Sequence, residues 1–254
     1  MRELRPSTDR LAASARCRGG ALLAALLAAL LAAASLLAVL AGLAGAQAPV
    51  PDEDAAPTPD EDATPADLRR AGLVSVRAQE PSIRLDVRYA TRRNFTGRRL
   101  PGYCRPLAVL RPFAAGDLAA VQRRLAPRGL GLVVYDAYRP VRATRAMVRW
   151  AERTGNSHLL RQGYIARRSR HNEGATVDLG LVSSQSGRPL DMGTPYDSFS
   201  TRSHTRNARG RALGNRMTLV RAMAAEGFRN YRREWWHFDH RRRGGRPLDV
   251  TLGC

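Results

Sequence analysis

The chain has 254 residues, of which 44% are hydrophobic, so it is long enough for one sizeable folded domain with accessory segments. Its formal net charge of +20 suggests a polyanionic partner. However, the basic residues are dispersed, and no stretch interleaves aromatic residues with arginines in the pattern of a DNA- or RNA-binding motif. We therefore exclude nucleic acid, which leaves weak association with anionic polymers of the cell envelope or, more simply, a solvated arginine-rich surface.

The N-terminal segment, residues 1–46, has the composition of an export signal. Residues 19–46 carry no charge, follow an arginine-bearing stretch and end in a small-x-small cleavage pattern at Ala46, which is typical of a signal peptide. Because about 20 apolar residues suffice to span a bilayer, an uncleaved N-terminal membrane anchor is the alternative. Either reading predicts a periplasmic or extracellular protein that contacts a membrane only if this segment is retained.

The next segment, residues 47–65, reads as an acidic, proline-rich tether. It repeats the sequence PDEDA, and Val50 is its only large apolar residue. Such a composition cannot bury a core. We expect an extended and disordered linker between the export segment and the folded domain.

The cysteines fit an exported protein. Cys17 precedes the apolar run and would be lost on cleavage, which leaves Cys104 and Cys254. Two thiols in an oxidising compartment usually pair. We therefore expect a disulfide between them, with two unpaired buried thiols as the alternative.

Residues 66–254 show the hydrophobic patterns of a single mixed domain. The patterns predict strands at 82–89, 130–135, 175–182 and 234–239, and helices at 114–126, 141–154 and 211–226. The last helix is expected to pack through Leu213, Met217, Val220 and Met223. Strands and helices are interspersed without a regular βαβ period, which favours an α+β domain over a parallel sheet.

Two of the five histidines have an acid at short range. His171 lies seven residues before Asp178 in SRHNEGATVD, and His237 lies three residues after Glu234 in EWWH. A catalytic zinc site needs three nitrogen or oxygen ligands with one open position, and a base that is not a ligand. The two histidines and Asp178 can be the ligands, Glu234 the base, and Arg139 in YDAYRP a cation for an oxyanion. The alternative is that His171 and the inward-facing Asp178 form a hydrogen-bonded structural pair that holds no metal.

The other three histidines carry no such signal. His158 and His240 lie among polar or basic residues, so we expect them to face solvent. His204 lies in a predicted loop, where bonding to the backbone is expected rather than to a metal.

The two motifs resemble those of the zinc D-alanyl-D-alanine dipeptidases of peptidase family M15, relatives of the D,D-carboxypeptidases and of the hedgehog-type fold. SRHNEGATVD matches the pattern S-x-H-x-x-G-x-x-x-D, and EWWH matches E-x-x-H. Further similar segments, in the same order, are RYATRRNFTG, PGYCRP, YDAYRPVRAT, GYIARRSRHNEG, LDMGTPYDSF and GFRNYRREWWHF. The resemblance implies a single domain with a small antiparallel sheet flanked by helices.

The resemblance also implies roles for individual residues. One zinc ion per chain would be held by His171, Asp178 and His237, with Glu234 as general base and acid, and Arg139 would bind the transition-state oxyanion. Asp197 would bind the free ammonium group of the substrate. Three more side chains would line the pocket: Tyr89, Tyr103 and Ser169.

The implied function is zinc-dependent hydrolysis of D-Ala-D-Ala, or of similar D,D-dipeptides, in the cell envelope. The alternative is a D,D-carboxypeptidase or endopeptidase that acts on longer peptidoglycan stem peptides with the same scaffold. A polymer-binding protein with a vestigial site is a third reading, which the intact set of ligands, base and arginine disfavours. Arg170 and Glu173 depart from the family pattern, and they bear on how the substrate carboxylate is bound.

Overall fold

The structure, a computed structural model, describes residues 65–254. The predicted export segment, and the predicted tether up to residue 64, lie outside the described residues. Helix α2 (Pro65–Arg70) begins at the last residue assigned to the tether. Within residues 65–254, no helix has the length and apolar character needed to cross a membrane.

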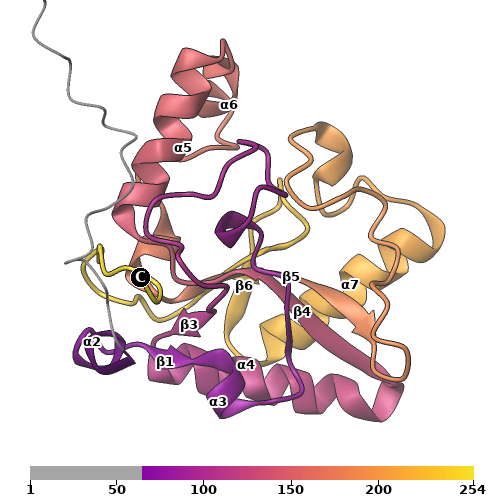
Figure 1. The fold of residues 1–254 in the computed structure, drawn as a ribbon. Coiled ribbons are helices and arrows are strands. Elements are labelled where there is room, and N and C mark those ends of the chain that lie inside the picture. The colour runs from indigo at the N-terminus through magenta and orange to yellow at the C-terminus, as the bar shows by residue number, and fades with distance from the viewer. Residues whose placement is uncertain (1–64) are drawn as a thin grey trace, which may run out of the picture. The chain divides into compact units, whose positions relative to one another are not determined.

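The centre of the fold is a mixed five-stranded sheet (Figure 1). Its middle strands are β4 (Leu130–Asp136) and β5 (Thr176–Ser183), both almost fully buried. The continuous apolar run of β4 is typical of such a strand, whereas the sequence of β5 alternates. The strand order is β2-β4-β5-β7-β6, with β2 at Arg84–Leu85, β6 at Phe228–Asn230 and β7 at His237–His240. Only β2 pairs parallel to its neighbour; all other pairs are antiparallel.

Two long helices cover one side of this sheet. Helix α4 (Pro112–Leu125) packs on β4, and α7 (Gly210–Ala225) packs on β5, β6 and α4 (Figure 1). Helices α5 (Val141–Arg153) and α6 (Ser157–Arg161) project away from the sheet. The remaining elements are short: β1 (Val74–Ser75), α3 (Val76–Gln79), η3 (Arg88–Ala90), β3 (Val109–Leu110), η4 (Ala126–Arg128), η5 (Arg170–Glu173) and η6 (Thr201–Ser203).

The predicted α+β class is confirmed, and the three predicted helices lie within two residues of their expected bounds. Two predicted strands are shorter than expected. The alternating segment 82–89 forms only β2, because the chain leaves the sheet and enters η3, which carries Tyr89. The segment 234–239 begins as a tight turn, and β7 starts at His237.

Helix α7 buries only part of the face that was predicted. Met223 is fully buried, whereas Leu213, Met217 and Val220 are only partly buried. Arg216 is completely buried, and its guanidinium donates to three loop carbonyls, those of Met192, Arg202 and His204. Its Nη2 is buried without a hydrogen-bond partner among residues 65–254, so the burial is compensated only in part.

The C-terminal residues run beside the segment that precedes β3. Tyr103 and Leu252 form an isolated parallel bridge, and Cys104 and Cys254 are joined by a disulfide with their Cα atoms 4.7 Å apart. This bond links residues 150 positions apart and holds the end of the chain against the domain.

Candidate active site

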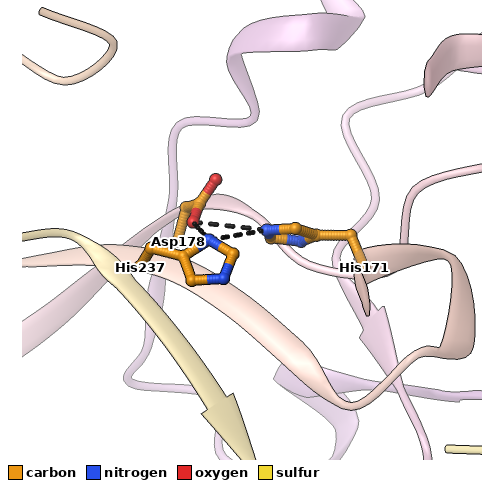
Figure 2. A group of neighbouring side chains, drawn as sticks. All are labelled: His171, Asp178 and His237. Carbon is orange, nitrogen blue, oxygen red and sulfur yellow. Dashed lines mark hydrogen bonds and ion pairs between the residues drawn. The ribbon is translucent and has the colours of Figure 1, made fainter. Parts of the chain in front are cut away.

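The two predicted motifs meet at one end of the sheet. Asp178 on β5 lies directly opposite His237 on β7 in the strand register. His171 lies on η5, the short turn that leads into β5. Ser169 caps this turn by accepting a hydrogen bond from the His171 amide at 3.3 Å. Figure 2 shows the three side chains converging on one point.

The spacing of the three side chains fits a tetrahedral metal site. His171 Nε2 lies 3.3 Å from both His237 Nδ1 and Asp178 Oδ1, and the last two atoms are 3.0 Å apart (Figure 2). Zinc–ligand bonds of about 2.0–2.1 Å at tetrahedral angles would place ligand atoms about 3.3 Å from one another. Two imidazoles and a carboxylate are also the donor types that zinc takes in hydrolases, so the site fits this ion.

Each candidate ligand is oriented by a further hydrogen bond. His171 Nδ1 lies 2.7 Å from the Ala137 carbonyl, so this nitrogen carries the proton and Nε2 is left as the metal donor. His237 Nε2 lies 3.4 Å from Asp239 Oδ1, and the Tyr196 hydroxyl donates to Asp178 Oδ2 at 3.0 Å. Sequence reasoning missed Tyr196 and Asp239 as parts of the site.

The electrostatics of the metal-free cluster follow from this packing. Burial lowers the pKa of His237, but its hydrogen bonds to the carboxylates of Asp178 and Asp239 outweigh this effect and raise the pKa to about 10. Burial raises the pKa of Asp178, but the neighbouring His171 and His237 hold this pKa well below its usual range. Asp178 is therefore held as a carboxylate, the form in which it can bind a metal ion.

Glu234 lies beside the triad without belonging to it. It occupies the turn between β6 and β7, is 7% exposed, and places Oε2 3.8 Å from His237 Nδ1. Burial raises the pKa of Glu234 to about 8, and His237 partly offsets this effect. A buried carboxylate next to the metal position, but outside the ligand set, is the arrangement required of a general base.

Arg139 is held rigidly at the edge of the same cavity. Its Nε and Nη2 donate to Asp136 Oδ2 at 2.9 and 2.7 Å, and Nη2 lies 3.7 Å from Asp178 Oδ2. Asp136 in turn accepts a 2.5 Å hydrogen bond from the Tyr103 hydroxyl. Tyr103 is thus not a pocket-lining residue as predicted: it is fully buried behind Arg139 and positions the arginine through Asp136.

Asp197 lies in a strained and half-buried setting. It is the only non-glycine residue among 65–254 with a positive φ, 58°, a conformation that aspartate tolerates better than most residues. Burial, and then the charge of Asp178, raise the pKa of Asp197 well above its usual range. A carboxyl group in this state lacks a cation.

A chain of oxygens connects Asp197 to the candidate ligands. The Tyr89 hydroxyl donates to Asp197 at 3.0 Å, and the Tyr196 hydroxyl lies 2.9 Å from that of Tyr89 and 3.0 Å from Asp178. The two tyrosine hydroxyls thus link the carboxyl group of Asp197 to that of Asp178.

These groups line one cavity of about 290 Å³. Of the nine predicted catalytic, ligand and pocket residues, eight line it, and Tyr103 is the exception. Arg170 also lines the cavity and pairs with Asp239 at 3.2 Å. Glu173 does not: it is buried and pairs with Arg243. Glu173 therefore does not bear on carboxylate binding.

The remaining histidines take no part in the cavity. His158 is exposed, as predicted. The prediction for His240 is wrong, because its ring is buried between Phe113 and Phe228 and bonds to Asp117 at 2.9 Å. The two phenylalanines come from distant parts of the chain, so the basic residues next to His240 in the sequence do not indicate that its ring is buried.

Comparison with known proteins gives the family. A family model described as D-ala-D-ala dipeptidase matches residues 69–250. The chain belongs to this peptidase family. It is 36% identical to a D-alanyl-D-alanine dipeptidase of Streptomyces coelicolor and 34% identical to one of Enterococcus faecalis, over 61% of this chain and 85% of each relative. A D-alanyl-D-alanine dipeptidase of Escherichia coli is 32% identical, over 69% of this chain and 88% of its own.

Membership of the D-Ala-D-Ala dipeptidase family makes this protein a hydrolase, as the motifs predicted. Family M15 is metal-dependent, and His171, Asp178 and His237 form the only group among residues 65–254 whose His, Cys, Asp or Glu ligand atoms lie close enough together to hold a metal ion, all within 4.8 Å of one another. The roles of individual residues stay predictions.

Proposed function

We propose that this protein is a zinc-dependent D,D-dipeptidase that hydrolyses D-Ala-D-Ala, or a similar D,D-dipeptide, after export to the cell envelope. The observation that carries the proposal is the position of Asp197 in the same small cavity as the triad and Glu234. A dipeptidase must recognise a free amino terminus. A half-buried carboxyl group that makes no ion pair among residues 65–254 would supply that recognition.

His171, Asp178 and His237 would hold the zinc ion. Zinc, when bound, would polarise the scissile carbonyl and lower the pKa of water. Glu234 would take the proton of the attacking water and then deliver it to the leaving amine. The carboxyl group that accepts this proton and then donates it is protected from bulk solvent by burial.

Arg139 would stabilise the negative charge that develops on the carbonyl oxygen. Its guanidinium is fixed by Asp136, so little reorganisation is needed when the charge appears. Asp197 would hold the substrate ammonium, while Tyr89 keeps the carboxyl group in place. Ser169 and Arg170 lie on the same wall and are available to the substrate carboxylate.

The test is a panel of L,L-, L,D-, D,L- and D,D-dialanine on the zinc-loaded protein, together with N-acetyl-D-Ala-D-Ala. The proposal expects hydrolysis of the free D,D isomer and little of the acetylated one. Preference for the acetylated substrate would instead favour the D,D-carboxypeptidase or endopeptidase alternative. Hydrolysis of L,L-dialanine alone would reject both.

The site of action is part of the proposal. Residues 19–46 support export as a cleaved signal or a retained anchor, and the cysteine pair supports an oxidising compartment. Alkylation of Cys17, or its absence from the mature protein, distinguishes the retained anchor from the cleaved signal. Cell fractionation tests the location itself.

A further inference from the structure

A second cavity, distinct from the active site, lies between α7, β6 and the segment after η6. It measures about 600 Å³. Its lining contains five arginines and no aspartate or glutamate: Arg206, Arg229, Arg232, Arg233 and Arg241. We call this cavity the arginine groove. The proposed peptidase chemistry uses none of these residues, although part of the lining lies in the segment GFRNYRREWWHF.

The arginine groove also has apolar lining residues. Met217 and Val220, from the stripe that the sequence predicts as the core face of α7, line it together with Ala224 and Phe228. Met217 and Val220 are only partly buried, since Arg216 occupies the buried face of the helix instead. The groove thus offers both apolar contact and positive charge.

The positive charge is not neutralised within the domain. Arg206, Arg229 and Arg241 are exposed, and their side chains make no ion pair or hydrogen bond among residues 65–254. The nearest acid on α7's C-terminal end, Glu226, is occupied by Arg124 at 2.8 Å. Burial and the charge of Arg233 lower the pKa of His204, so this lining residue is neutral at pH 7. A ligand must supply the missing anions.

Arginine favours phosphate because its planar fork donates two parallel hydrogen bonds. Single-stranded nucleic acids bind by stacking bases on accessible aromatic rings, but the only aromatic residue of the lining, Phe228, is 1% exposed. An added peptide strand needs a hydrogen-bonding edge, and β6 offers only three residues. The exposed arginines and the apolar lining residues together suit a ligand whose phosphates are separated by short uncharged units, because these units can pack against the apolar residues.

We propose that the arginine groove binds a linear envelope polymer in which phosphodiesters alternate with short uncharged carbon units. The phosphates pair with the arginines of the rim, and the carbon units pack against Met217 and Val220. Such binding would retain the exported enzyme at the cell wall. It is separate from the peptidase chemistry, so failure of one proposal leaves the other standing.

The test measures binding of a fluorescent poly(glycerol phosphate) oligomer to the full zinc-loaded chain by anisotropy, at about 50 and about 200 mM salt. The variant is Arg206→Gln/Arg229→Gln/Arg241→Gln. The matched control, Arg77→Gln/Arg128→Gln/Arg145→Gln, removes the same charge from three exposed arginines outside the groove. Dipeptide hydrolysis is assayed in parallel and should be unchanged in both, which shows that both fold.

We expect the groove variant to weaken binding about tenfold or more and to flatten its salt dependence, whereas the control changes affinity less than about threefold. Equal losses in both variants would mean diffuse attraction to the surface and would overturn the proposal. So would the absence of binding. Tighter, groove-dependent binding of a single-stranded oligonucleotide or of poly-glutamate would assign the groove to a nucleic acid or an acidic peptide instead.

Discussion

Replacement of Asp197 by asparagine separates a dipeptidase from a peptidase of longer substrates. Asparagine keeps the size of the side chain, tolerates the positive φ at this position and can still accept the hydrogen bond from Tyr89. The substitution therefore removes the carboxylate charge with little other change. Its effect on the reaction reports on the charge alone.

The magnitude follows from the charge that is removed. Asp197 would pair with the substrate ammonium in the active-site cavity, and a hydrogen bond to a charged group contributes about 1.5–3 kcal/mol. At about 1.36 kcal/mol per decade, kcat/KM on free D-Ala-D-Ala should fall by about 10- to 150-fold. The slow rate on N-acetyl-D-Ala-D-Ala, which carries no ammonium, should barely change. Steady-state kinetics on the two substrates measures both.

A matched control is Asp191→Asn, an exposed position that precedes Asp197 on the same loop. Its side chain accepts a hydrogen bond from the Gly193 amide at 2.8 Å, which asparagine can also accept, so no change in rate is expected. Equal losses on the free and acetylated dipeptides in Asp197→Asn would make Asp197 a structural residue. The reasoning about the ammonium site would then be refuted.

Three further predictions concern the metal site and the disulfide. Glu234→Ala should keep zinc but lose about 10²- to 10⁴-fold in rate, whereas His171→Ala should lose zinc and activity together. If Glu234→Ala also lost zinc, Glu234 would be a ligand rather than the base. Chelation should lower the melting temperature, because an ion that binds only the folded state at 100 times its Kd stabilises by about 2.7 kcal/mol, and an unchanged melting temperature would show that no such ion is bound. If Cys104 and Cys254 are paired, the denatured, unreduced mature protein should contain no free thiol, and two titratable thiols would contradict the pairing. The variant Cys104→Ser/Cys254→Ser should then lose up to about 4–5 kcal/mol of unfolding free energy in the chain-entropy model.

The ligand set could be proposed from sequence because each member comes with a close neighbour along the chain. Asp239 could have been added, since it follows His237 by two residues and so shares its face of β7. Tyr196 gave no such signal, because it lies in an irregular loop whose path no periodicity determines. Its contact with Asp178 appears only when the loop has folded over the sheet.

The limits of the fold prediction have a similar origin. Long periodic segments such as α4 and β4 were found, whereas the two-residue strands β1 and β3 are too short to show a period. In α7 the apolar pattern found the buried Met223 but missed the buried Arg216, because pattern reasoning places arginine in solvent. Burial of Arg216 depends on distant carbonyls of the loop 192–204 that accept hydrogen bonds from its guanidinium.

The charges of the active site explain why a metal ion and a free amino terminus belong together here. Glu234, Asp197 and Asp178 lie in one cavity, and in the metal-free protein burial raises the pKa of Glu234 to about 8 and that of Asp197 well above its usual range. A bound dication would lower the pKa of Glu234 and leave it as the carboxylate that a base must be at pH 7. The substrate ammonium would do the same for Asp197. A peptide with a blocked amino terminus brings no such charge, so Asp197 would stay protonated and contribute little to its binding.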